Sequence, residues 1–187
     1  SEITLNPTWN EIFDFLPQLR DRRKQFGHVN YKENDLREIT AQTYGMISHI
    51  DHNVGRVMSA LKDNKLMDNT IVVFLADHGE YLGSHHLLYK AEWPWEELLR
   101  VPFIWRVPDA YNPGKVTEKV VSLLDFAPTI LDYAGIKQDE LDIRGKRKAD
   151  RLGLPGRSLK KSLSKGEELR DKPAIMEYDE DWHEGPT

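Results

Sequence analysis

The chain has no cysteine among its 187 residues, which excludes disulfide bonds and leaves its redox compartment open. It also has no apolar run close to the roughly 20 residues that a membrane-spanning helix requires. An excess of one charge is missing as well, because 26 Lys and Arg stand against 31 Asp and Glu, for a net charge of −5. We therefore expect neither a membrane nor a nucleic acid as a partner.

The first residues lack the basic and apolar regions of a signal peptide, since the chain begins Ser1-Glu2-Ile3-Thr4-Leu5. No compartment follows from this, because a true N-terminus can lie upstream. With 39% hydrophobic and 30% charged residues, the chain can form one domain with a core or part of a larger domain.

The strongest positive signal is an apolar run that ends abruptly in polar residues. Residues 71–76 read Ile-Val-Val-Phe-Leu-Ala, which is typical of a strand buried on both faces, as in a parallel sheet. Such sheets carry their chemistry at the carboxyl ends of strands, where Asp77 and His78 stand. Gly79 lets the chain turn away sharply. A carboxylate beside an imidazole in this position predicts a pair of metal ligands.

Helices and strands are predicted to alternate around this run. The patterns indicate a short helix over 9–23, a long helix that opens with Asp35 and Glu38, and a strand over 101–107. The long helix should bury one face, which comprises Ile47, Ile50, Val54, Val57, Met58 and Leu61. The alternation indicates an α/β fold with a sheet layered by helices.

The last part of the chain is less regular. A helix is predicted over 126–133, with Asp125 as its N-cap. Residues 137–172 are mostly charged and read as a loop, and 173–178 are a candidate for a final strand. We therefore divide the chain into an irregular lead-in (1–34), an α/β core with the metal-ligand motif (35–136), and a charged loop region with a final strand (137–187).

Several short motifs follow Asp77-His78-Gly79 in a specific order. They are Leu82-Gly83-Ser84-His85, then Lys90, then Arg100-Val101-Pro102. Further matching segments are Tyr44–Gly55, Leu124–Leu131, Ala134–Ile136 and Leu154–Leu159. Together they resemble the sulfatase family of the alkaline phosphatase superfamily. This resemblance implies a mixed, largely parallel, alkaline-phosphatase-like sheet, of which this chain would be an incomplete C-terminal portion.

The resemblance also shows what this chain does not contain. Sulfatases of this kind carry a formylglycine made from Cys or Ser in a C/S-x-P/A-x-R motif, together with an Asp pair that completes the metal site. Neither motif occurs here. We therefore expect the nucleophile to lie in a missing N-terminal half of the same protein, and we expect that half to be a partner of this chain. The isolated chain should be inactive on aryl sulfates.

Roles for individual residues follow from the resemblance. Asp77 and His78 would bind a divalent cation; the family favours Ca²⁺, and the ligand types leave Mg²⁺ and Zn²⁺ open. Lys90 would hold the sulfate oxygens and offset charge that develops in the transition state. His85 would orient the substrate or protonate the leaving oxygen, with a purely structural role as its alternative.

Ordinary explanations stand beside these roles. Asp77 can simply cap a strand end, and Lys90 can be a surface charge. His49 and His52 lie one turn apart on the long helix and are interpreted as core or surface residues, not as a second metal site.

Aromatic residues and one more histidine are candidates for substrate contacts. Trp93 and Trp95 could stack on a sugar, and His183 could reach the rim of the pocket, whereas Trp105 is expected in the core. The basic run over 144–161 is interpreted as a solvated loop, with guidance of an anionic glycan as its alternative.

The resulting hypothesis is a sulfuric ester hydrolase, arylsulfatase-like or acting on a sulfated small molecule or glycan, with this chain carrying part of the metal and sulfate site. One alternative is a phosphonate or phosphate ester hydrolase, or a phosphoethanolamine transferase, of the same superfamily. Another is a non-catalytic assembly module that pairs with a partner or forms a homo-oligomer. The resemblance is compatible with a periplasmic or secreted protein.

Overall fold

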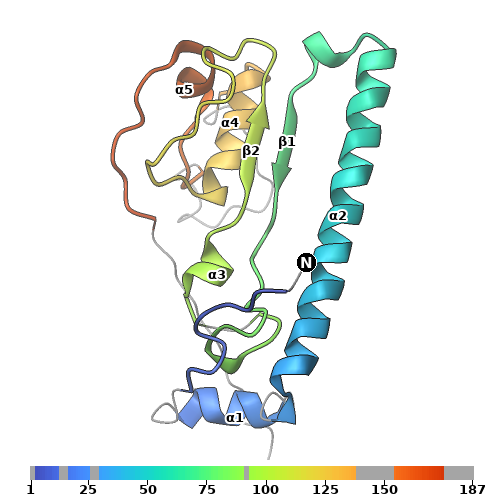
Figure 1. Ribbon diagram of the computed structural model, residues 1–187. Helices are drawn as coiled ribbons and strands as arrows, with labels where there is room; N and C mark the ends of the chain where they lie inside the picture. The colour runs from blue at the N-terminus through green and yellow to red at the C-terminus, as the bar shows by residue number, and fades with distance from the viewer. Residues whose placement is uncertain (1–2, 13–16, 26–29, 91–92, 138–153, 175–187) are drawn as a thin grey trace, which may run out of the picture. The chain divides into compact units, whose positions relative to one another are not determined.

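The computed structural model describes residues 3–12, 17–25, 30–90, 93–137 and 154–174 (Figure 1). The chain divides into two compact units, which are described separately. The first unit comprises residues 1–68 and 75–102, and the second comprises 69–74 and 103–187. Within the described ranges, no helix has both the length and the apolarity needed to cross a bilayer.

The first unit opens with a turn and a short helix, α1, Pro17–Gln25. The predicted helix over 9–23 therefore starts and ends too early in the sequence. Trp9 lies in a turn instead, because the side chain of Asn6 accepts a hydrogen bond from the amide of Thr8 at 3.0 Å and favours local turn bonds over a helix. Pro17 suits the first helical position, because its missing N–H would have no partner inside a helix there.

The long helix, α2, spans Glu33–Asp63 and confirms the predicted element. It begins two residues before the predicted start, and Asp35 contributes from within the first turn by accepting the Lys32 amide at 2.8 Å. Its buried residues are Leu36 and Thr40.

The predicted buried face of α2 is only partly buried, since Val54, Met58 and Leu61 are half-buried and its other members are exposed. Ile47, Ile50 and Val57 are about half exposed, at 56%, 49% and 57%. Within the first unit, the packing of α2 is concentrated at its N-terminal end. There the side chain of Leu36 closes over Gly83 so tightly that a Cβ on Gly83 would lie 2.4 Å from it. The periodicity thus identified an apolar stripe but did not indicate which of its residues are buried by contacts with other segments.

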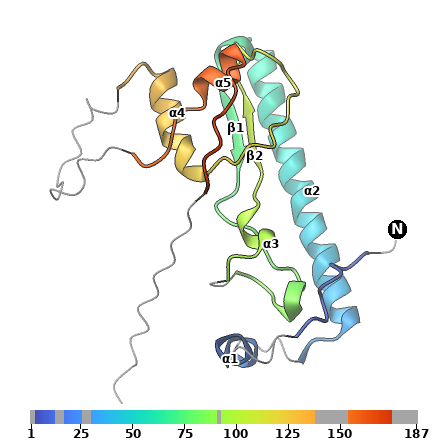
Figure 2. The same ribbon diagram turned by 90° about the vertical axis from the view of Figure 1, so that its left-hand side faces the viewer.

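The core of the first unit forms where α1 meets the loop after β1. Leu19 of α1 packs with Tyr81 and Leu87, and Trp93, Trp95 and Leu98 lie against them. This loop contains the 3₁₀ turn η3, Ser84–His86, and leads into the short helix α3, Glu96–Leu99. Figures 1 and 2 both show the loop between α3 and α1.

Two strands form the described sheet of the second unit. They are β1, Val72–Leu75, which follows the 3₁₀ turn η2, Met67–Asn69, and β2, Phe103–Arg106. Their arrows point in opposite directions in Figure 1, so this pair is antiparallel. Both predicted strands are present, and the α/β class is confirmed. The expectation that the first strand is buried on both faces does not hold within this pair, because Phe74 is 37% exposed and the other residues of β1 are half-buried.

The helices of the second unit are held by one buried carboxylate. The helix α4, Phe126–Tyr133, has the predicted bounds and follows the 3₁₀ turn η4, Leu123–Asp125. Asp125 is the N-cap residue of α4, as predicted, but its side chain makes no capping hydrogen bond to that helix. Its carboxylate instead accepts the Ser122 amide at 3.2 Å and the Arg157 amide at 2.8 Å, with the Arg157 Nε at 3.7 Å. Asp125 is only 4% exposed.

A helix also occurs where a loop was predicted. This helix, α5, spans Lys160–Lys165 within the predicted loop over 137–172 and ends at Gly166, whose φ of 69° is left-handed. It forms because Leu159, just before it, is buried and donates its amide to Thr129 of α4 at 2.9 Å. Of the predicted strand over 173–178, residues 175–178 lie outside the described residues, and 173–174 are irregular.

Candidate active site

The turn after β1 depends on a glycine. The Gly79 amide donates to the Leu98 carbonyl at 2.8 Å, which brings the backbone of α3 directly against it. A Cβ at this position would lie 1.8 Å from the Glu97 carbonyl oxygen, so no side chain fits without moving the helix. Asp77 and His78 are therefore carried out of the strand together, at its carboxyl end as predicted, and the Asp77 side chain is 86% exposed.

The side chains of Asp77 and His78 face each other. The His78 amide donates to Asp77 Oδ1 at 3.0 Å, while Asp77 Oδ2 lies 3.7 Å from His78 Nε2. His78 Nδ1 lies 2.7 Å from the Gly79 carbonyl oxygen, which can only accept, so Nδ1 is the donor in this contact and, in the neutral imidazole, Nε2 keeps the lone pair. A second hydrogen bond that orients an imidazole in this way is usual for metal-binding histidines.

These donors fit a divalent cation. An oxygen and a nitrogen 3.7 Å apart can both reach one ion with bonds of about 2.0–2.4 Å. The pKa of Asp77 lies below its ordinary value, first because the His78 amide donates to the carboxylate, then because of its own amide and the charges of His78 and Lys90. No third carboxylate or imidazole joins them within the described ranges, so these two residues alone would give an incomplete ligand set.

Lys90 follows the loop and is exposed to solvent. Its positive charge lowers the pKa of Asp77, although less than the hydrogen bonds to that carboxylate do. Within the described residues, the ammonium makes no hydrogen bond or ion pair, so it is available to an anion.

His85 lies in a packed environment, in contrast to Lys90. Its side chain is 13% exposed, with Nδ1 3.2 Å from Glu11 Oε2 and its ring 3.9 Å from that of Trp95. Its backbone is held too, because its amide donates to Thr8 and its carbonyl accepts from Arg23 at 2.7 Å. These contacts favour the structural alternative over a role at the substrate.

The aromatic candidates are also part of the packing. The rings of Trp93 and Trp95 stack at 6.2 Å, and Tyr81 donates its hydroxyl hydrogen to the Trp93 carbonyl at 2.7 Å. Trp105 contacts Phe103 and Phe126, as expected for a core residue. His49 and His52 are exposed on α2, and His183 lies outside the described residues.

A carboxylate that the sequence did not single out organises this loop. Glu97 accepts hydrogen bonds from Ser84 at 2.6 Å and from Asn6 at 3.3 Å, and Ser84 lies 2.9 Å from the Thr8 hydroxyl. Burial alone would raise the pKa of Glu97, but these hydrogen bonds, its own amide and the charge of His85 outweigh it and lower the pKa. Sequence reasoning missed Glu97 and Glu11, because nothing in their local spacing indicates partners about 75 to 90 residues away.

The family model described as Sulfatase matches residues 11–136, which is more than half of the chain. The chain belongs to the sulfatase family.

This sulfatase chain is 40% identical over 113 residues to an arylsulfatase of Clostridium perfringens, a match that covers 59% of this chain and 23% of that protein. Among solved structures, it matches the phosphonate monoester hydrolase of Agrobacterium radiobacter with 30% identity and a TM-score of 0.65, covering 76% of this chain and 26% of that one. A structure in complex with its substrate D-glucosamine-2-N,6-O-disulfate matches with 29% identity and a TM-score of 0.54, and this match covers 81% of this chain and 28% of that one. The chain thus spans about a quarter of the length of these proteins.

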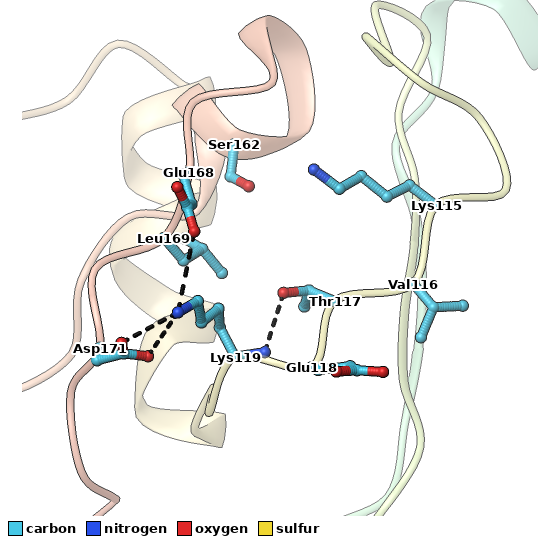
Figure 3. Close-up of a pocket in the computed structure, with 9 residues that line it drawn as sticks. All are labelled: Lys115, Val116, Thr117, Glu118, Lys119, Ser162, Glu168, Leu169 and Asp171. Atoms are coloured by element: carbon cyan, nitrogen blue, oxygen red, sulfur yellow. Dashed lines mark hydrogen bonds and ion pairs between the residues drawn. The ribbon is translucent and has the colours of Figure 1, made fainter.

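The second unit of this sulfatase chain has a surface depression of about 590 Å³ that none of the predicted site residues line. Figure 3 shows Lys119 in it between Asp171, at 3.0 Å, and Glu168, at 3.9 Å. Both carboxylates raise the pKa of Lys119, first through the hydrogen bond from its ammonium to Asp171. Lys119 is thus already paired with two carboxylates, and Lys115 also lines the depression.

Proposed function

We propose that this chain forms part of the active site of a sulfuric ester hydrolase and supplies two cation ligands and one ammonium that holds the sulfate group. The convergence of Asp77 Oδ2 and His78 Nε2, 3.7 Å apart, carries the proposal, since these exposed donors have a geometry that suits a shared cation. The family membership supports the same reading.

The chemistry divides between the cation and Lys90. A bound divalent cation, Ca²⁺ in this proposal, would supply Lewis-acid stabilisation of negatively charged oxygens. Asp77 contributes an ionised carboxylate down to low pH because its pKa is lowered, and the Gly79 carbonyl keeps His78 in the ligating tautomer. Lys90 then offers its ammonium to the sulfate oxygens, where it offsets developing charge. The nucleophile and the remaining ligands would come from the N-terminal part of the protein.

The substrate class in this proposal is a sulfated glycan or small aryl sulfate. An arylsulfatase and a structure bound to a disulfated glucosamine stand among the similar proteins. A second candidate is a phosphonate monoester, because the match to a phosphonate monoester hydrolase has 30% identity over 76% of this chain. Both substrates present tetrahedral anionic oxygens to the same groups.

Calorimetric titration of the chain with Ca²⁺ tests the metal site. We expect Asp77→Ala and His78→Ala each to weaken binding at least about tenfold, because each removes a ligand. Asp51→Ala and His52→Ala, the same residue types exposed on α2, should leave the affinity unchanged. Equal affinity in all four variants would show that the loop is not the cation site.

Competition between anions on the Ca²⁺-loaded chain tests the substrate class. Inorganic sulfate should bind, and Lys90→Ala should weaken it. If methylphosphonate binds at least as tightly as sulfate and responds equally to Lys90→Ala, the phosphonate candidate replaces the sulfate ester.

A further inference from the structure

The loop between the cation ligands and Lys90 is closed at its base by one carboxylate. Glu80 Oε1 accepts the Leu82 amide at 3.1 Å and the Tyr89 amide at 2.5 Å. The Tyr81 amide donates to the Tyr89 carbonyl at 3.1 Å, which closes the same ring from the backbone side. Glu80, which follows His78 and Gly79, therefore ties the start of the loop to Tyr89, the residue next to Lys90.

The backbone of this loop adopts conformations that need such support. Leu82, His85, His86 and Tyr89 all have positive φ, between 45° and 64°, although none is a glycine. Side chains disfavour this region, so the surrounding contacts must impose it. Tyr89, with a φ of 64°, is both one of these residues and the donor to Glu80. The residue immediately before Lys90 is thus held in a conformation that it would not adopt by itself.

The two ends of the loop have separate supports. At the tip, Glu97 accepts from Ser84, and Thr8 contacts both Ser84 and His85. At the base, the side-chain bonds to the Leu82 and Tyr89 amides both come from Glu80. A change at Glu80 should consequently loosen the base and leave the packed tip in place.

We propose that Glu80 is a positioning residue that acts through Lys90. By fixing the Tyr89 amide, it sets where the Lys90 ammonium stands relative to Asp77 and His78, so that one anion can contact both the cation and the ammonium. The proposal rests on the proposed function for the role of Lys90. It predicts that Glu80 affects anion binding while the cation ligands keep their own geometry.

The test compares Glu80→Ala and Glu80→Gln in the whole chain. Glutamine keeps an oxygen that accepts both amides and removes only the charge, whereas alanine removes the acceptor. The matched control is Glu38→Ala, an exposed glutamate of α2 in the same unit. For each variant, calorimetry measures the affinity for Ca²⁺ and, on the Ca²⁺-loaded chain, the affinity for inorganic sulfate. Amide NMR spectra report the order of residues 82–90.

Glu80→Ala is expected to weaken sulfate binding about tenfold, as a small misplacement of a charged group does. Its Ca²⁺ affinity should stay within about twofold of the unchanged chain, and residues 82–90 should lose order. Glu80→Gln should restore both sulfate affinity and loop order. If Glu80→Ala binds sulfate as tightly as the unchanged chain, or if glutamine fails to rescue the loss, the positioning role is refuted.

Failure of the proposed function would look different. If the unchanged chain binds neither Ca²⁺ nor sulfate, the proposed function is refuted. The role of Glu80 is then tested only by the order of the backbone amides of residues 82–90. In that case, the Glu80 proposal would also be overturned if residues 82–90 are equally ordered in Glu80→Ala and in the unchanged chain.

Discussion

At the level of single residues, two carboxylates join segments that lie apart in the sequence. Glu97 joins α3 to η3 and to the lead-in, and Asp125 joins η4 to the segment before α5. Each is a short side chain that satisfies donors from segments far apart in sequence. Such groups are costly to leave unpaired once buried, so their partners matter as much as they do.

The lowered pKa of Glu97 makes part of the stability of the first unit pH-dependent. A carboxylate with a folded pKa below its ordinary value of 4.5 stabilises the fold above 4.5, and this contribution is lost as pH falls through the folded pKa. Glu97→Gln should therefore be less stable than the unchanged chain at pH 7, and the difference should shrink below about pH 4.5. Urea unfolding at several pH values measures this. A difference that is constant from pH 7 to pH 3 would contradict the assignment.

Arg157 should be among the most sensitive residues of the second unit. Its guanidinium donates to the carbonyls of Val120, at 2.6 Å, and Arg170, at 2.5 Å, and faces the buried Asp125 carboxylate. Arg157→Met should destabilise the chain by about 3 kcal/mol, because it leaves Asp125 buried without its cation. Arg100→Met, which breaks an ion pair that is 84% and 82% exposed, is the control and should cost less than about 1 kcal/mol. Similar losses for both, measured by urea unfolding, would show that the buried pair has no special weight.

At the scale of elements, close approach of backbones decides which segments pack together. Gly79 permits α3 to contact the turn after β1, and Gly156 permits the segment before α5 to contact η4. A Cβ on Gly156 would lie 1.9 Å from the Leu124 carbonyl oxygen and 2.8 Å from the Asp125 amide. These contacts set the position of α5, which a reading of local charge could not predict.

Two glycine substitutions separate this effect from ordinary helix propensity. Gly156→Ala should destabilise the chain by about 1–3 kcal/mol, because the neighbouring backbone must shift to admit a methyl group. Gly45→Ala, in the open interior of α2 with nothing within 4 Å of the added atom, should stabilise it by up to about 1 kcal/mol. Thermal unfolding of the two variants measures the contrast, and a stabilising Gly156→Ala would refute the close approach.

At the scale of the whole molecule, the chain exposes many large apolar side chains. Ile47, Ile50 and Val57 are exposed on α2, and Ile104 is exposed on β2. Burying one such side chain fully is worth about 1.5–3 kcal/mol, so a few of them together represent a large part of a domain's net stability. This is what a sheet and a long helix would expose when they lack neighbours supplied by another chain or segment.

We therefore predict that the purified chain self-associates or binds the N-terminal part of its protein. Sedimentation should show species larger than 21.7 kDa whose proportion rises with concentration. Ile50→Glu and Ile104→Glu should each shift the equilibrium toward monomer, whereas Glu38→Gln on the same helix should not. A compact monomer at every concentration would show that these side chains need no partner.

Features that depend on neighbouring residues could be predicted from local patterns. The β1 run, the Asp77-His78-Gly79 turn and the bounds of α4 were predictable, because strand periodicity and glycine conformation are local properties. The ordered motifs after Gly79 also indicated the sulfatase family, to which the chain belongs.

Tertiary structure alone decided the features that depend on distant partners. His85 is packed because Thr8, Glu11 and Arg23 hold it from more than 60 residues away. Asp125 pairs with Arg157 rather than capping its own helix through its side chain, and α5 forms where local charge indicated a loop. Burial and pairing depend on contacts between segments that are distant in the sequence, so local patterns cannot predict them. An unpaired buried charge costs free energy, and this cost favours the packing arrangements in which each buried charge has a partner.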